Sequence, residues 1–399
     1  MVKTTPFHPR LAVLNQTSLY GLWSNYLSPR RYVMSAKQEY FAVRTAAGFF
    51  DTSPLFKYWI RGRDAEAFLA GVMTRDIRTC RPGHAQYTVW CDDRGYVLED
   101  GVIFRHSGDE FFMTSARPNL GYLMDLVGRL DVTIEDVSEE YGLLAVQGPR
   151  SREILEQLTP DVSGLGYFDL TPTKIGSAAV TVSRTGYTGD LGYEVLVAAD
   201  DAVAVLDAVI EAGQGRGLRP FGEDALVMTR IEAGLVLIDV EFSSSRLAWT
   251  DHDRVTPREL GFGWMLRRIE TDHRAFIGRE ALIREGRDET TRWSTVGLLV
   301  DWSHYQSLYL SAGLLPPKDE SPLAWESMLY DEKGTRVGYA TSLMYSPMLQ
   351  RHIAMARVRP DLGAVGTTVN VELTINHEYH TVRAEVARLP LFNPTRKTA

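Results

Sequence analysis

The stretch Ser183–Glu194 reads SRTGYTGDLGYE and lies between two runs that are rich in valine and alanine. It holds three glycines at intervals of three residues: Gly186, Gly189 and Gly192. Glycines spaced in this way are unusual in a plain strand, and they allow a tight excursion in which backbone can approach a flat ligand. Tyr187 and Tyr193 offer aromatic faces, and Glu194 offers a bidentate acceptor for a guanidine-like edge. From these residues alone, a glycine-rich hairpin and a binding site are about equally supported.

A pair of adjacent acids, Glu99 and Asp100, lies inside the apolar run Gly95–Phe104, GYVLEDGVIF. Neighbouring side chains in a strand point to opposite faces. We therefore expect one acid to face solvent or a sheet edge and the other to face an apolar interior. A carboxylate among apolar residues needs a partner. That partner is either an arginine of the protein or a ligand amine.

The segment Thr229–Leu235, TRIEAGL, places Arg230 and Glu232 near the end of a predicted helix. Arg230 presents a fork that suits a carboxylate. Its predicted partner is either the glutamate tail of a ligand or Glu232 itself, and a purely structural role is equally well supported.

Around these segments the pattern predicts three regions. Residues 1–50 are aromatic and basic and become helical over 38–48, where Gly48 reads as a helix end. Strands and helices then recur in a β-α-β-β manner, which favours an α+β fold over a doubly wound parallel sheet. A charged stretch, 283–293, reads as a linker. The strand-rich remainder predicts a small β-barrel or jelly roll.

Composition limits the function classes. The chain has 399 residues, 44% apolar and 24% charged, which suits two or three ordinary domains. Its net charge of -8 disfavours a nucleic-acid partner. Cys80 and Cys91 lack paired spacing, so we expect reduced thiols and a cytoplasmic location. No run reaches the length needed to span a bilayer and no leader pattern is present, so we expect no membrane partner.

Two motifs carry little chemistry. AGQGRG at 212–217 follows a predicted helix instead of opening one, so it reads as a helix end and not as a nucleotide loop. HEYH at 377–380 falls where a barrel hairpin turns, and no cysteine or carboxylate cluster completes a set of metal ligands nearby. We therefore expect no metal.

Taken together and in order, several segments resemble the glycine-cleavage T-protein (aminomethyltransferase) family. The resemblance runs over almost the whole chain. It includes YFAVRTAAGFFDTSPLFKYWIRGRDAEAFL, RDIRTCRPGHAQYT, GYVLEDGVIF, LLAVQGP, SRTGYTGDLGYE, TRIEAG, FIGREAL, RVGYATSLMYSPML and IAMARV. Each piece is weak by itself, whereas the ordered set is specific.

The resemblance implies a three-domain cloverleaf with tetrahydrofolate bound near its centre. The implied ranges are 1–50 plus 137–285 for a folate-binding α+β domain, 51–136 for a second α+β domain, and 290–399 for the barrel. Asp100 matches the family's essential carboxylate near N5 of the pterin, and Glu194 matches the acid that grips the amino-pyrimidine edge. Tyr87 and Tyr187 match folate-contacting tyrosines, and Arg230 matches an arginine near the folate.

Departures from the family pattern lie where the one-carbon donor is expected. Ser115 replaces a folate-contacting asparagine, and Leu226 and Ile238 stand where the glycine-cleavage enzymes have other residues. These changes are similar to those in relatives that demethylate O-, S- or N-methyl compounds onto tetrahydrofolate. The expected reaction therefore moves a methyl group from a small methylated substrate to N5, with ionised Asp100 stabilising the developing positive charge.

Two other functions stay open. One is glycine-cleavage aminomethyl transfer from a lipoyl carrier protein, which the missing asparagine and arginine disfavour. The other is folate binding without turnover, as in related iron–sulfur assembly proteins. Those proteins carry a cysteine in the segment that here reads Arg184–Asp190, RTGYTGD, and this chain has none there.

Overall fold

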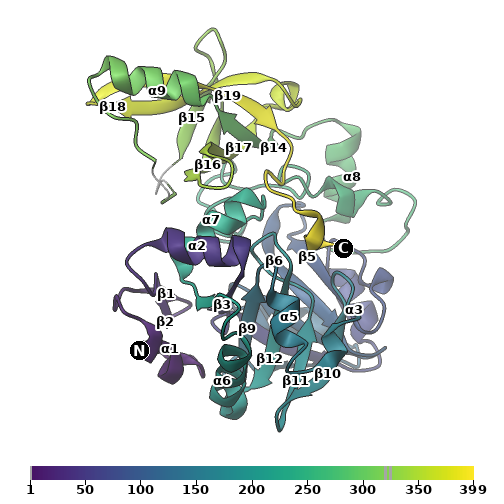
Figure 1. The fold of residues 1–399 in the computed structure, drawn as a ribbon. Coiled ribbons are helices and arrows are strands. Elements are labelled where there is room, and N and C mark those ends of the chain that lie inside the picture. The colour runs from purple at the N-terminus through teal and green to yellow at the C-terminus, as the bar shows by residue number, and fades with distance from the viewer. Residues whose placement is uncertain (1, 319–320, 323–325) are drawn as a thin grey trace.

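The computed structural model describes residues 2–318, 321–322 and 326–399. The described part contains two open sheets, a closed barrel and a small hairpin. Figure 1 shows the barrel at one end of the molecule and the open sheets at the other, with helices α2 (Ala36–Thr45) and α7 (Glu223–Glu232) between them. The predicted α+β fold class is confirmed.

The first open sheet carries the Ser183–Glu194 segment. Its strands, in spatial order, are β10 (Leu170–Ile175), β11 (Ala178–Ser183), β12 (Gly192–Ala198), β9 (Tyr141–Gln147), β3 (Ala47–Asp51) and β13 (Leu218–Pro220). All neighbours are antiparallel except β13, which runs parallel to β3. Helix α6 (Ala202–Ala212) buries one apolar stripe, Val205, Leu206 and Val209, in the same core as β9 and β12. Helices α1 (His8–Leu14) and α5 (Ser151–Leu155) add to this core through Leu11 and Leu155.

The second open sheet carries the acid pair. Its strands, in spatial order, are β5 (His84–Cys91), β6 (Val97–Arg105), β7 (Glu110–Ser115), β4 (Phe56–Arg61) and β8 (Thr133–Asp136). Helices α3 (Ala65–Val72) and α4 (Leu120–Val127) pack on one face, where Phe68 and Leu123 share a core with Ile103. On the other face, Phe104 packs in a cluster with Leu143 of the first sheet.

The C-terminal barrel is closed by six strands. In order around the barrel they are β14 (Ser294–Val300), β17 (Arg351–Val358), β16 (Arg336–Ser346), β15 (Ser327–Tyr330), β18 (Thr368–Ile375) and β19 (Glu378–Ala387). Helix α9 (Trp302–Ser311) packs on it, and the Asp301 carboxylate caps that helix by accepting from the His304 amide at 3.0 Å. The predicted barrel is confirmed.

The remaining described elements are short. They are β1 (Tyr20–Trp23), β2 (Tyr26–Pro29), α8 (Arg279–Arg287), and the 3₁₀ turns η1 (Ile77–Thr79), η2 (Pro160–Val162), η3 (Ala199–Asp201), η4 (Gly263–Leu266), η5 (Pro360–Leu362) and η6 (Thr395–Lys397). The predicted three ranges contain the two open sheets and the barrel, apart from Asp51 at the end of β3. The domain bounds themselves stay a prediction.

Two local predictions are wrong, and one helix was not predicted. Gly48 does not end a helix: α2 stops at Thr45, and Gly48 lies in β3, where an added Cβ would come within 2.6 Å of the Phe221 ring. The charged stretch 283–293 is not all linker, because its first half completes α8. Helix α9, in the strand-rich C-terminal region, was not predicted. In each case the packing partner is distant in sequence, so the local pattern did not reveal it.

A central cluster joins the three parts of the molecule. Its buried members come from the first sheet and its helices, from the second sheet, and from the barrel, and they include Phe50, Val89, Met228, Ile238 and Met355. The junction of the three parts is therefore a packed apolar core. None of the helices in the described ranges combines the length and the apolar character that crossing a bilayer requires.

Candidate functional site

A β-bulge in β6 sorts the acid pair between two faces of the second sheet. Trp90 lies opposite Glu99, whereas the next residue, Cys91, lies opposite Val97, so Leu98 is the extra residue. Asp100 lies opposite Val89, on the side of the central cluster. Glu99 and Leu98 go to the side of α3 and α4. The acids face opposite ways, as expected: Glu99 is buried and Asp100 is half-buried, and β6 lies inside the sheet and not at its edge.

Asp100 is held by a tyrosine from the neighbouring strand. The Tyr87 hydroxyl donates to Asp100 Oδ2 at 2.9 Å, and both side chains are half-buried. Burial raises the pKa of the Asp100 carboxyl, and the Tyr87 hydrogen bond opposes that rise. Burial, followed by the Asp100 charge, raises the pKa of Tyr87 well above its usual value. Tyr87 is therefore a neutral donor to a carboxylate that keeps acceptor capacity for a second group.

Glu99 is almost fully buried beside Asp100. Its carboxyl oxygens accept from the backbone amides of Asp100 and Arg117, each at 3.1 Å. Burial and the adjacent Asp100 charge raise the pKa of Glu99, and they outweigh the two amide hydrogen bonds. Two carboxyl groups this close do not both ionise readily. Asp100 is more exposed than Glu99 and accepts the hydrogen bond from Tyr87. Asp100 is therefore the member of the pair that carries the negative charge.

Tyr187 lies near the same carboxylate. Its hydroxyl donates to the Val236 carbonyl, which joins the Ser183–Glu194 segment to the residues after α7. Burial raises the pKa of Tyr187 above its ordinary value, and the charges of Glu241 and Asp100 raise it further. The structure therefore brings Tyr187 to the Tyr87–Asp100 pair, which lies on the neighbouring strands β5 and β6 of the other sheet.

Arg230 is buried in an ion pair between α7 and the barrel. Its Nη1 donates to Glu241 Oε2 at 2.6 Å, and its Nη2 donates to the Ser342 hydroxyl at 2.9 Å. Its side chain is 1% exposed. The Arg230 charge is near Tyr187 and opposes the rise in the pKa of that tyrosine. Of the two predicted partners, Glu232 is not bonded to Arg230, and the carboxylate that the structure provides is Glu241.

Glu194 lies opposite Ser183 on β12 and is half-buried. It accepts a hydrogen bond from the Thr185 hydroxyl. Burial raises the pKa of its carboxyl, and the Thr185 bond opposes the rise. A carboxylate that accepts one hydrogen bond has positions left to accept from a donor with two N–H groups.

Protein contacts account for the glycines of Ser183–Glu194. An added Cβ at Gly186 or Gly192 would come within 2.1 or 2.2 Å of the Gln147 amide, and one at Gly189 within 2.3 Å of Ala233. Gly189 also has a positive φ of 72°. The hollow lined by these glycines has a volume of about 20 Å³, enough for roughly one water. The approach of a flat ligand to this backbone stays a prediction.

Ser115 lies at the end of β7, opposite Gly101 of β6. Its hydroxyl donates to the Arg117 carbonyl at 2.8 Å and accepts from the Asn119 amide nitrogen at 3.2 Å. The side chain is 2% exposed. Ser115 therefore shapes the turn after β7, and the structure does not bring it to the Tyr87–Asp100 pair.

Sequence reasoning missed three residues that build the site. Gln147 donates to the carbonyls of Thr185 and Tyr193 and so holds both sides of the segment Ser183–Glu194, here called the glycine segment. Glu241 neutralises Arg230. Arg44 donates to the Thr188 carbonyl at 2.8 Å, and its Nε and Nη2 both donate to Glu232 Oε2. Polar residues inside apolar runs were the available signal. In the part of the chain that the structure describes, no group of three or more metal-type side chains is assembled.

Two models of known protein families match this chain. The family model described as the GCVT N-terminal domain matches residues 11–268, and the model of the glycine cleavage T-protein C-terminal barrel domain matches residues 311–393. Together they include the acid pair, the glycine segment, α7 and most of the barrel.

Two curated relatives differ in name and length. A trimethylamine-oxide aldolase of Ruegeria pomeroyi is 34% identical over 95% of this chain, which spans only 46% of that protein. An aminomethyltransferase of Geobacillus thermodenitrificans is 30% identical, and the match covers 94% of each chain.

A solved structure gives the same fold. The glycine cleavage system aminomethyltransferase T of Bartonella henselae superposes with a TM-score of 0.82, over 98% of this chain and 99% of that one, at 20% identity. The predicted three-part architecture with a C-terminal barrel is confirmed.

Proposed function

Because the chain belongs to the glycine-cleavage T-protein family, we propose that it moves a methyl group from a small O-, S- or N-methylated donor to N5 of tetrahydrofolate. Enzymes of this family are tetrahydrofolate-dependent one-carbon enzymes. The observation that carries the proposed chemistry at N5 is the Tyr87–Asp100 pair, which faces the junction of the two sheets and the barrel.

The residues present fit tetrahydrofolate. Glu194 is a half-buried carboxylate with one protein partner, so it can accept from the N–H groups of an amino-pyrimidine edge. Asp100 keeps a free acceptor position beside Tyr87 and Tyr187. When bound, tetrahydrofolate supplies a secondary amine, N5, as the acceptor of the one-carbon unit.

In this proposal the chain contributes charge and position. Asp100 stays ionised because Tyr87 donates to it and because Glu99 holds the proton of the acid pair. A fixed carboxylate in an apolar setting stabilises positive charge developing near it, which contributes roughly 3 kcal/mol. Tyr187 is fixed by the Val236 carbonyl and offers its ring face as one wall.

A methylated donor is supported by two apolar residues that stand where the glycine-cleavage enzymes have other residues. Ile238 is buried in the central cluster, and Leu226 packs against it. An apolar lining suits a methyl group better than a charged aminomethyl group. The name of the Ruegeria relative, which refers to trimethylamine oxide, supports the N-methylated class among the three donor classes.

A second candidate is aminomethyl transfer from a lipoyl carrier protein. The aminomethyltransferase of Geobacillus thermodenitrificans, which matches over nearly its whole length, supports it.

The test is incubation of the purified protein with tetrahydrofolate and a panel of methoxy-aromatic, methylated-sulfur and N-methyl compounds. The product is read by mass. We expect 5-methyl-tetrahydrofolate from one donor class, and a 10²–10³-fold loss of kcat in Asp100→Asn. Asp125→Asn, an exposed change of the same kind on α4, serves as the control.

The other outcomes separate the candidates. Ammonia release from an aminomethyl-lipoyl carrier would favour the second candidate. Methylene-tetrahydrofolate as the sole product would favour aminomethyl or N-methyl oxidation chemistry. Tetrahydrofolate binding without turnover of any donor would identify a folate-binding protein.

A further inference from the structure

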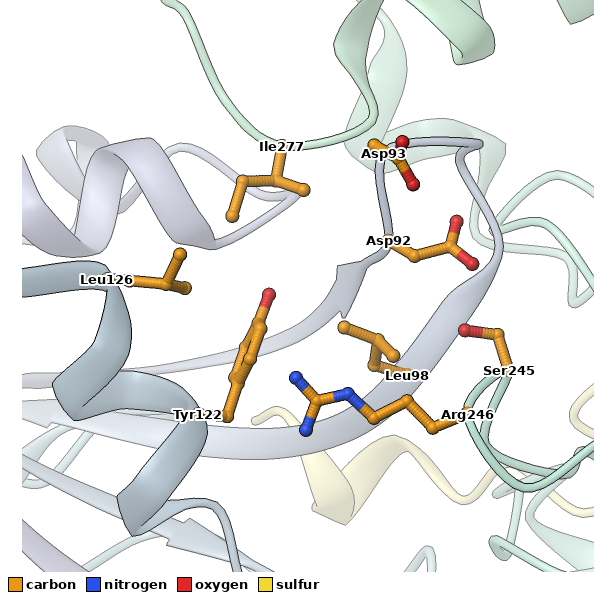
Figure 2. A pocket seen from close by; sticks show the side chains of 8 residues that line it. All are labelled: Asp92, Asp93, Leu98, Tyr122, Leu126, Ser245, Arg246 and Ile277. Atoms are coloured by element: carbon orange, nitrogen blue, oxygen red, sulfur yellow. The ribbon is translucent and has the colours of Figure 1, made fainter.

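A second cavity lies in the second sheet's half of the molecule, on the face opposite Asp100. It has a volume of about 290 Å³ and is bounded by α4, the β5–β6 turn, the segment after α7, and the residues before α8. Its lining consists of Asp92, Asp93, Leu98, Tyr122, Leu126, Ser245, Arg246 and Ile277 (Figure 2). Leu98 is the extra residue of the β6 bulge, which turns it away from Asp100.

Two buried hydroxyls at this cavity have no partner among the described residues. Ser245 is 4% exposed, and its Oγ makes no hydrogen bond to them. The Tyr122 hydroxyl is likewise buried and unbonded, and burial raises the pKa of this phenol to about 12. Figure 2 shows the Ser245 hydroxyl directed into the space between the labelled side chains. A buried hydroxyl without a partner destabilises the protein, and a polar ligand group placed there would offset that cost.

A guanidinium lies over the ring of Tyr122. The Arg246 Cζ lies 4.2 Å from the centre of the Tyr122 ring, and Arg246 pairs with no acid of the described chain. A guanidinium stacked on a ring keeps its N–H edge free for a carboxylate. Arg246, Tyr122 and Ser245 therefore supply hydrogen-bond donors to the cavity, with the Ser245 hydroxyl across from Tyr122 in Figure 2.

Two acids form another side. Asp93 makes no hydrogen bond or ion pair with the described residues. Asp92 Oδ1 accepts from the backbone amides of Arg94 and Tyr96, and its Oδ2 is 3.8 Å from the Arg94 guanidinium. Asp93 is thus the freer acceptor for a cation. With two carboxylates and one guanidinium at the cavity, a dianion is disfavoured.

Between the charged groups the lining is apolar. Leu98, Leu126 and Ile277 come from β6, α4 and the segment before α8. A cavity with a few placed polar groups on an apolar wall has the general form of a small-molecule site.

We propose that this cavity binds a small zwitterion with an apolar side chain, of the α-amino-acid class. Arg246, Tyr122 and Ser245 bind its carboxylate, Asp93 and Asp92 bind its ammonium group, and the apolar wall receives its side chain. This site goes beyond the one-carbon reaction, because it shares no residue with the Tyr87–Asp100 group.

The test uses L-leucine as the probe in calorimetric titration of the full chain. Two matched compounds each lack one charge: 3-methylbutylamine has no carboxylate, and 4-methylpentanoate has no ammonium group. We expect L-leucine to bind at one site and each matched compound to bind at least 10-fold more weakly. We expect Arg246→Gln and Ser245→Ala each to weaken L-leucine binding at least 5-fold. Arg129→Gln, an exposed change of the same charge outside the cavity, should have no effect.

Three results would overturn the proposal. They are no heat of binding at 10 mM L-leucine, equal binding in wild type and Arg246→Gln, and loss of L-leucine binding in Asp100→Asn, which would place the ligand in the other site. Since Ser245→Ala and Arg246→Gln alter side chains that form no hydrogen bond with the part of the chain that the structure describes, both variants should fold. A thermal unfolding midpoint within 2 °C of wild type verifies this.

Discussion

At the scale of single residues, Asp100 depends on Tyr87 for its charge. Burial raises the pKa of Asp100 and the Tyr87 hydroxyl opposes that rise. Removing the hydroxyl should therefore raise the pKa further. Because the ionised form is the active one in the proposed reaction, activity is present above this pKa and is lost as the pH falls through it.

We expect Tyr87→Phe to move the acid limb of the pH–kcat profile to higher pH, with activity at high pH largely retained. The comparison is Tyr187→Phe, whose hydroxyl bonds the Val236 carbonyl and not Asp100. If both variants shift the limb equally, Tyr87 does not act through Asp100.

Glu194 is the residue on which pterin binding should depend most. We expect Glu194→Gln to weaken tetrahydrofolate binding by about 10–100-fold, since a charge-assisted pair of hydrogen bonds contributes about 1.5–3 kcal/mol. Equilibrium fluorescence titration measures it. Glu140→Gln, an exposed acid in the same half of the chain, should bind as the wild type does.

At the scale of elements, α7 connects the first sheet's helices to the barrel through two buried carboxylates. Arg230 pairs with Glu241, which also accepts from the hydroxyls of Thr341 and Ser342 on β16. Glu232, two residues along the helix, accepts from Arg44, Tyr40 and Ser346. One helix therefore sets the position of the barrel over the first sheet.

We expect Arg230→Met to lower the free energy of unfolding by about 3–5 kcal/mol, because it leaves Glu241 buried without its cation. Urea unfolding measures this loss. The double variant Arg230→Met with Glu241→Gln should recover part of it, since no unpaired charge remains. Additive losses in the double variant would mean that the two side chains act independently.

At the scale of the whole molecule, the C-terminal segment returns from the barrel to the glycine segment. Arg396 forms two hydrogen bonds with the Asp190 carboxylate, at 2.7 and 2.8 Å, and Arg184 donates to the carbonyls of Arg396, Lys397 and Ala399. Figure 1 shows this segment descending from the barrel beside the open sheets. The loop that carries Tyr187 is thus held in part by residues two hundred positions away.

We expect Arg396→Gln to lower the local opening free energy of residues 184–190 by about 1 kcal/mol, because Asp190 keeps Arg44 at 3.6 Å as a second cation. Hydrogen exchange of those amides measures it. The control is Arg388→Gln, because the Arg388 side chain is exposed and forms no hydrogen bond or ion pair with the described residues. Unchanged exchange in Arg396→Gln would mean that the segment does not restrain the loop.

The amino-acid sequence by itself determined the α+β class and the closing barrel, because strand alternation and turn residues are local properties. It also determined the family, because the motifs and their order can be read directly from the chain. It also singled out the pair Glu99 and Asp100, since polar side chains in apolar runs are costly without a purpose, whereas Tyr87 entered only through the family resemblance. Only the tertiary structure decided which face each acid takes, because one bulge at Leu98 changes the alternation. It alone decided that Arg230 pairs with Glu241. The glycines of SRTGYTGDLGYE also have another reason than the pattern indicated: Gln147 and Ala233 occupy the space that side chains there would need, and such contacts form only once distant strands and helices pack together.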